Sequence, residues 1–146
     1  MKRLLTLIFT LSFVLMACNN DDIVNKPTEI QLSTDAPKNQ QGHIVVSAQG
    51  GTYAVYITNY KYFYLDKYAF FENGKSIADK IEMPPHPSAS SSTETHVRSE
   101  WFSAVALGNK LTITFKANAS SKTRLLKTHI SFANVEKPIT FLQAAE

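Results

Sequence analysis

The feature that most constrains the fold is the strict alternation of apolar and polar residues from Lys110 to Ala117. Leu111, Ile113 and Phe115 stand at every second position, and Lys or Thr fills the positions between them. Successive side chains of a β-strand point to opposite faces of a sheet, so this pattern predicts a strand with one buried face. A helix would need apolar residues three or four positions apart, and no long segment of the body of the chain has that spacing.

Several other segments repeat the alternation and predict further strands. They are residues 124–132, with Leu126, Thr128, Ile130 and Phe132 on one face; residues 138–143, with Pro138 at the first position; and residues 43–47 and 52–58, joined through Gly50-Gly51. The glycines are expected to turn the chain between the last two segments, which would then pair. Residues 118–123 are expected to connect the strands on either side of them. Ile30 and Leu32 indicate a first edge strand. Short strands at this spacing predict an all-β fold, an antiparallel β-sandwich.

The N-terminus has the organisation of an export signal. Lys2 and Arg3 precede an apolar run from Leu4 to Val14, and Leu15-Met16-Ala17-Cys18 follows. A basic start, a short apolar stretch and small residues form a secretory signal, and the cysteine makes it resemble the lipobox of bacterial lipoproteins. The resemblance implies that residues 1–17 are a signal peptide and that Cys18 is the site of lipidation. The apolar run is too short to cross about 30 Å of hydrocarbon, so we expect a membrane anchor through the lipid on Cys18.

The segment after Cys18 is polar. Residues 18–38 contain few large apolar side chains, so we expect a flexible tether there and one domain over residues 39–146. The pair Asp21-Asp22 resembles the surface-export signal of lipoproteins in Bacteroidetes-type bacteria. That resemblance implies an outer-membrane lipoprotein exposed at the cell surface; an orientation toward the periplasm is the alternative.

An ordered set of residues between His43 and Ala145 resembles a known family. Gly50-Gly51-Thr52 precedes a strand, Trp101 follows, a strand ends at Asn118, Arg124 begins the next strand, and Gln143 lies near the end. This order resembles the BACON family, the Bacteroidetes-associated carbohydrate-binding often N-terminal domains. The resemblance implies an immunoglobulin-like β-sandwich in which Trp101 belongs to the core. We expect Arg124 and Gln143 to be structural as well, and Asn118 to support its own turn.

The chain departs from this family pattern in two places. The aromatic run Tyr60 to Leu65 stands where the family has its first tryptophan, with Tyr62 or Phe63 nearest that position. Residues 66–100 then separate this run from Trp101, and we interpret them as an inserted loop region. The middle of that region, Met83 to Thr93, is rich in Pro and Ser and predicts a mobile surface loop.

All six tyrosines lie between Tyr53 and Tyr68. If residues 60–65 are extended, Tyr60, Tyr62 and Tyr64 share one face at a spacing of roughly 7 Å, and Phe63 points to the other. We favour Phe63 inward, which turns the three tyrosines outward as a candidate ligand-binding row. Alignment through Tyr62 would reverse the two faces. Aromatic rings with polar tips are suited to sugar rings, although tyrosine is also common on half-buried strands for reasons of packing alone.

The remaining composition argues against other functions. Removing residues 1–17 takes away two basic residues and leaves a nearly neutral domain without a basic stripe, so no nucleic-acid partner is expected. No motif indicates a catalytic site, a metal site or a cofactor, so we expect a non-enzymatic protein. Two functions remain: recognition of a glycan or glycoprotein at the cell surface, and a structural role in which the domain binds another envelope protein or acts as a spacer.

Overall fold

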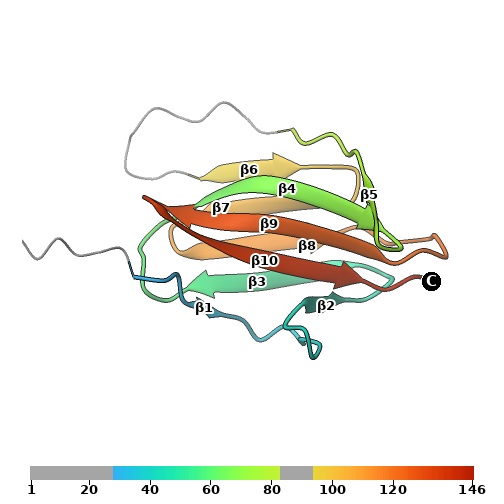
Figure 1. The fold of residues 1–146 in the computed structure, drawn as a ribbon, viewed down its shortest axis with the longest axis horizontal. Helices are drawn as coiled ribbons and strands as arrows, with labels where there is room; N and C mark the ends of the chain where they lie inside the picture. Colours follow the sequence, from blue (N-terminus) through green and yellow to red (C-terminus); the bar gives the residue numbers. More distant parts are fainter. Residues whose placement is uncertain (1–27, 83–93) are drawn as a thin grey trace, which may run out of the picture.

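The computed structural model describes residues 28–82 and 94–146, and this part of the chain forms two five-stranded sheets packed face to face (Figure 1). No described segment is helical, and hence none is a helix of the length and hydropathy that a membrane span requires. The expected fold, an all-β immunoglobulin-like sandwich, is confirmed. Residues 1–27, which include the expected signal peptide and Cys18, and residues 83–93, where a surface loop is expected, lie outside the described residues.

The ten strands divide evenly between the sheets. The first sheet has the order β1 (Leu32–Ser33), β3 (Gly51–Ile57), β8 (Lys110–Phe115), β7 (Phe102–Leu107) and β6 (Thr95–Arg98). The second sheet has the order β2 (Ile44–Val46), β10 (Val135–Gln143), β9 (Arg124–Phe132), β4 (Tyr64–Glu72) and β5 (Lys75–Ile77). In Figure 1 the second sheet, with β4, β9 and β10, lies in front of β7 and β8. All neighbouring strands are antiparallel except β2 and β10, which are parallel.

The core lies between the sheets and is built from the alternating residues that the sequence indicates. On β8, Leu111, Ile113 and Phe115 are buried, while the Lys and Thr residues between them are exposed or half-buried. On β9, Leu126, Thr128 and Ile130 are buried in the same way. Aromatic rings fill the middle of the sandwich. Phe115 contacts Phe141 at 5.3 Å and Phe102 contacts Phe70 at 6.3 Å between ring centroids, both across the two sheets, while Phe102 and Phe115 are neighbours within the first sheet, at 5.8 Å. Burial of each such ring contributes about 1.5 to 3 kcal/mol to the free energy of unfolding.

Two buried amide side chains join the sheets where the chain crosses from β8 to β9. Asn118 donates from Nδ2 to the carbonyl oxygens of Lys122 and Ala144, both at 2.8 Å, and its Oδ1 accepts from the Ser120 hydroxyl. Gln143, on β10, donates from Nε2 to the carbonyl oxygen of Lys116, which directly follows β8, at 2.7 Å. Both residues are only 1% exposed. The expected structural roles of Asn118 and Gln143 are therefore seen as hydrogen bonds between segments of different sheets.

The expected pairing of residues 43–47 with 52–58 is wrong. Both segments contain a strand, but β2 pairs with β10 in the second sheet and β3 pairs with β8 and β1 in the first. Gly50 and Gly51 therefore carry the chain from one sheet to the other. A Cβ on Gly50, which has φ +79°, would lie 2.2 Å from the carbonyl oxygen of Phe115, so the two backbones approach more closely than any other residue would permit.

The boundaries expected on either side of the domain also change. Within the expected tether, residues 28–38 belong to the sandwich: Leu32–Ser33 form β1, as the alternation with Ile30 indicates, and Ile30 is completely buried. The expectation of one inserted loop over residues 66–100 is wrong in part, because this range holds most of β4, all of β5 and all of β6. The turn Asn73-Gly74 joins β4 to β5, and both residues have positive φ, as a tight two-residue hairpin requires.

Pro138 occupies an open position in the middle of β10, not the start of the strand. β10 begins at Val135, and β2 pairs only with its last residues, Phe141–Gln143. The N–H of Ala144 donates to the carbonyl oxygen of Val46, on the side of β10 where β2 lies. Backbone groups alternate in direction along a strand, so those of Leu142, Thr140 and Pro138 face the same side as those of Ala144. No described strand lies on that side of Pro138. The missing N–H of Pro138 therefore removes no bond from the β9 ladder.

We predict that Gly50→Ala strongly destabilises the sandwich. The new Cβ would collide with the backbone of Phe115 and would also force alanine into a left-handed conformation. The expected loss is about 3 to 4 kcal/mol in the free energy of unfolding, measured by urea denaturation. Gly42→Ala is the matched control, since Gly42 has φ +78° and nothing within 4 Å of its added Cβ. Only the conformational cost applies there, about 1 to 2 kcal/mol. Equal losses in the two variants would contradict the close approach at Gly50.

We predict that Asn118→Asp destabilises the protein by about 3 to 5 kcal/mol at pH 7. The carboxylate would face the carbonyl oxygens of Lys122 and Ala144, which Asn118 now donates to. Burial beside these oxygens raises the pKa of the new carboxyl in the folded state, so the variant should regain stability as the pH falls through that raised pKa. The control is Asn109→Asp, because Asn109 also donates to a backbone carbonyl but is exposed. Thermal unfolding between pH 4.5 and 8 tests this; a pH-independent loss in Asn118→Asp would refute it.

Candidate functional site

The tyrosine row forms at one end of the second sheet, although only Tyr64 of its three members lies in a strand. Phe63 and Leu65 are both 4% exposed, so the favoured orientation with Phe63 inward is confirmed and the reverse orientation is wrong. Tyr62 and Tyr64 face solvent, with exposed fractions of 49% and 37%. Their rings meet edge to face at 6.0 Å between centroids, a favourable aromatic geometry. We refer to the exposed pair Tyr62 and Tyr64 as the tyrosine platform.

Tyr60 does not share this surface and has a structural position. Its ring stacks on Phe132 at 4.3 Å between centroids, and its hydroxyl donates to the carbonyl oxygen of Thr28. Tyr60 therefore fastens the segment before β1 to the end of β9. Tyr62 also contacts Phe132, edge to face at 5.1 Å between ring centroids. Phe132, which was expected on the core face of its strand, is half-buried and contacts both Tyr60 and the platform residue Tyr62.

Polar side chains continue the platform along the outer face of the second sheet. Tyr64 pairs with Ser131 across the β4–β9 ladder, and the Ser131 hydroxyl donates to Asp66 Oδ2 at 2.9 Å. Beside them, Lys67 forms an ion pair with Glu136, and His129 Nδ1 lies 3.3 Å from the same carboxylate. Hydrogen bonds from Lys67 and then from His129 hold the pKa of the Glu136 carboxyl below its usual range. The platform is thus bordered by a hydroxyl, two carboxylates and a cation, all able to hydrogen-bond.

A bulge in β4 places these groups. The register of β4 against β9 shifts between Asp66 and Ala69, and Lys67 has φ +52°. The extra residues allow Leu65 and Phe70, five positions apart, both to point into the core. Tyr68 lies within the bulge, where burial, followed by the charge of Asp66, raises the pKa of its hydroxyl. Tyr68 is therefore a neutral, half-buried part of the bulge and does not belong to the platform.

The expected core residue Trp101 is buried and acts at the other end of the sandwich. It is 5% exposed, and Phe70 meets it edge to face at 5.3 Å. The guanidinium of Arg124 lies 4.9 Å from the ring centroid of Trp101, and Arg124 Nε lies 3.7 Å from Glu72. The expected structural role of Arg124 thus consists of covering the Trp101 ring.

An apolar row that was not expected from the sequence lies on the outer face of the second sheet, far from the platform along the strands. The row crosses four strands through directly paired residues: Val45 with Leu142, Leu142 with Leu125, and Leu125 with Phe71. All four side chains are half-buried and lie on the face that points away from the core. We call these four residues the outer apolar row.

Residues for acid–base or metal chemistry are dispersed in the described structure. No group of three His, Cys, Asp or Glu side chains in residues 28–82 and 94–146 is arranged to hold a metal ion. The histidines there that contact carboxylates, His96 with Glu94 and His129 with Glu136, do so at the surface. The expectation of a protein without catalytic, metal or cofactor residues stays a prediction.

Comparison with known proteins supports the fold. No protein-family model matches the chain, and no curated protein matches it. A solved structure described as "NMR structure of the protein from Bacteroides thetaiotaomicron" is similar, with a TM-score of 0.56 and 18% sequence identity. The match covers 82% of this chain and 89% of that one. At this identity the likeness shows a shared fold, and the resemblance to the BACON family stays a prediction.

Proposed function

We propose that this protein is a non-catalytic recognition module, held on the bacterial outer membrane by lipid on Cys18 and facing the cell exterior, that binds a glycan through its tyrosine platform. The observation that carries this proposal is the exposed edge-to-face pair of Tyr62 and Tyr64. Exposure of two adjacent aromatic rings on one surface is unfavourable in water, and such a patch favours a binding partner. The export signal and the Asp21-Asp22 pair support the location.

The groups around the platform match the chemistry of a sugar. A pyranose ring presents an apolar face of C–H groups, which stacks on an aromatic ring, and hydroxyls around its rim. Ser131, Asp66 and Glu136 supply hydroxyl and carboxylate partners for such hydroxyls on the same face of the sheet. Tyr62 is supported by Phe132 and Tyr64 by the β4 strand, so binding would require little ordering of the platform.

We predict that Tyr62→Ala/Tyr64→Ala abolishes glycan binding without unfolding the domain. The measurement is a glycan array, followed by titration of the best ligand, using a chain that begins at Asn19 and so retains every buried core residue, from Ile30 to Phe141. The expected loss of affinity is at least about tenfold, or about 1.4 kcal/mol. Tyr60 is left intact because it anchors the segment before β1.

Tyr56→Ala is the matched control for this experiment. Tyr56 is 38% exposed, close to the value for Tyr64, but it lies on the first sheet beside Lys110. This variant should bind glycan as the unchanged protein does. Retained binding in the double variant, or no binding by the unchanged protein to any glycan, would overturn the proposal.

The outer apolar row favours a second candidate function, assembly with another envelope protein. The outer apolar row is a continuous apolar strip across four strands of the second sheet, which is typical of a protein–protein contact. The alternative of a simple spacer would not require such a strip.

We predict that a photo-crosslinking residue in place of Leu125 gives a discrete crosslinked product in cells if assembly is the function. The same residue in place of Tyr56 is the control, because it is exposed on the opposite sheet. Substitution of Leu142 by Asp should remove the Leu125 product, since Leu142 is its paired neighbour in the row. Absence of any product at Leu125, or equal products at both positions, would exclude assembly through this face.

A further inference from the structure

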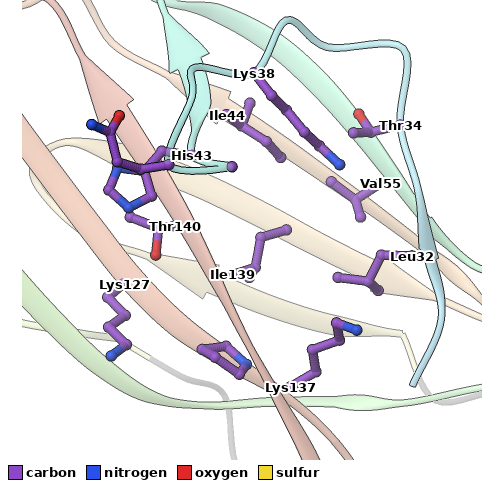
Figure 2. A pocket seen from close by; sticks show the side chains of 13 residues that line it. Leu32, Thr34, Lys38, His43, Ile44, Val55, Lys127, Lys137, Ile139 and Thr140 are labelled. Atoms are coloured by element: carbon purple, nitrogen blue, oxygen red, sulfur yellow. The ribbon is translucent and has the colours of Figure 1, made fainter. Parts of the chain in front are cut away.

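A cleft opens along the edge of the sandwich where β1 ends the first sheet and β2 covers only part of β10. Its volume is about 430 Å³, within the range of small-molecule sites. Leu32, Val55 and Ile139 supply apolar side chains from three different strands (Figure 2). The cleft is separate from the tyrosine platform, none of whose residues line it.

The open edge of β10 is protected against the addition of another strand. Pro138 faces the open side and has no N–H to offer a partner strand. Lys137 lies on the same side of β10 as Val135 and Ile139, the side that faces the core. A charged side chain that points inward at the edge of a sheet opposes pairing with a further strand. An extended peptide is therefore a poor occupant of this edge, and a small molecule in the cleft is the better one.

The two ends of the cleft differ in charge. In Figure 2, Leu32, Val55 and Ile139 lie between Lys38 at one end and Lys137 at the other. Lys137 Nζ is 2.6 Å from Glu29, and this contact lowers the pKa of the Glu29 carboxyl, so that end carries a neutralised pair. Lys38 and Lys127, which both line the cleft, make no ion pair with any described residue, and no acidic side chain lines the cleft. One end is thus closed by a salt bridge, and the other end is cationic.

The loop that carries Lys38 is held in place before any ligand arrives. Lys38 forms an antiparallel bridge with Ile44, and Val45 N–H donates to the Pro37 carbonyl at 2.8 Å. Asn39 Oδ1 accepts from the N–H groups of Gln41 and His43, at 3.0 and 2.9 Å. The backbone position of Lys38 is fixed, so its ammonium is available to the cleft at a small entropic cost.

We propose that this cleft binds a small anionic amphiphile, with its head on Lys38 and its apolar body along the half-buried Leu32, over the buried side chains of Val55 and Ile139. An anionic head matches the two lysines that line the cleft without an ion pair to a described residue, Lys38 and Lys127. The volume suits a free single-chain amphiphile and is too small for a phospholipid with two chains. This site is independent of the proposed glycan platform.

The test is an NMR titration of the ¹⁵N-labelled chain beginning at Asn19 with decanoate, decanol and decylamine, each below its micelle-forming concentration. Decanoate should shift the amide signals of Thr34, Gly42 and Thr140, which line the cleft, and should bind at least about fivefold more tightly than decanol. Decylamine should bind most weakly. Lys38→Gln should weaken decanoate binding about fivefold and leave decanol binding unchanged, whereas Lys75→Gln, at an exposed position on β5, should change neither.

Four results would overturn the proposal. Equal affinity for decanoate and decanol would remove the role of charge. Decanoate shifts confined to the outer apolar row would place the ligand on the sheet face and not in the cleft. Shifts of the cleft signals by phosphatidylglycerol vesicles but not by decanoate would assign the surface to a membrane. Both lysine variants fold under this design, because Lys38 and Lys75 are exposed; equal weakening by both would likewise contradict a specific contact at Lys38.

Discussion

The hydrogen bonds of two buried amides, Asn118 and Gln143, join the sheets at the point where the chain passes between them. A crossing segment cannot use a sheet ladder for its backbone groups, and buried groups without partners are costly. Asn118 meets the Lys122 and Ala144 carbonyls, and Gln143 meets the Lys116 carbonyl. These bonds set the ends of β8, β9 and β10 relative to one another. The close approach of Gly50 to β8 occurs in the same region, so this end of the sandwich tolerates little change.

Prediction from the sequence succeeds where a strand is regular and one of its faces is buried. β8 and β9 meet both conditions, and the alternating pattern gave β9 its observed limits, Arg124 and Phe132. β4 fails the first condition, because its bulge places Leu65 and Phe70 on the same side although they are five positions apart. Only the Asn73-Gly74 pair marked this region as a hairpin in the sequence. Pairing is harder still, since nothing local in residues 44–46 indicates that β2 runs parallel to β10.

The candidate site was predictable in part for the same reason. Local alternation is enough to turn Phe63 inward and Tyr62 and Tyr64 outward, and the structure agrees. It could not separate Tyr60 from the other two, because the stacking partner of Tyr60, Phe132, is distant in the sequence. The outer apolar row and the cleft escaped prediction because each is assembled from strands whose order follows from the topology alone.

Stability and the proposed recognition are divided between different members of the same cluster of tyrosines. Tyr60 contributes a stacked ring and a hydrogen bond to the fold, whereas Tyr62 and Tyr64 contribute surface. The same division holds along β10, where Phe141 fills the core while Lys137 and Pro138 keep an open edge from pairing. An edge protected in this way can stay uncovered beside an apolar cleft without inviting aggregation. That protection allows a small sandwich to keep two separate surfaces accessible, one aromatic and one cationic, on a single core.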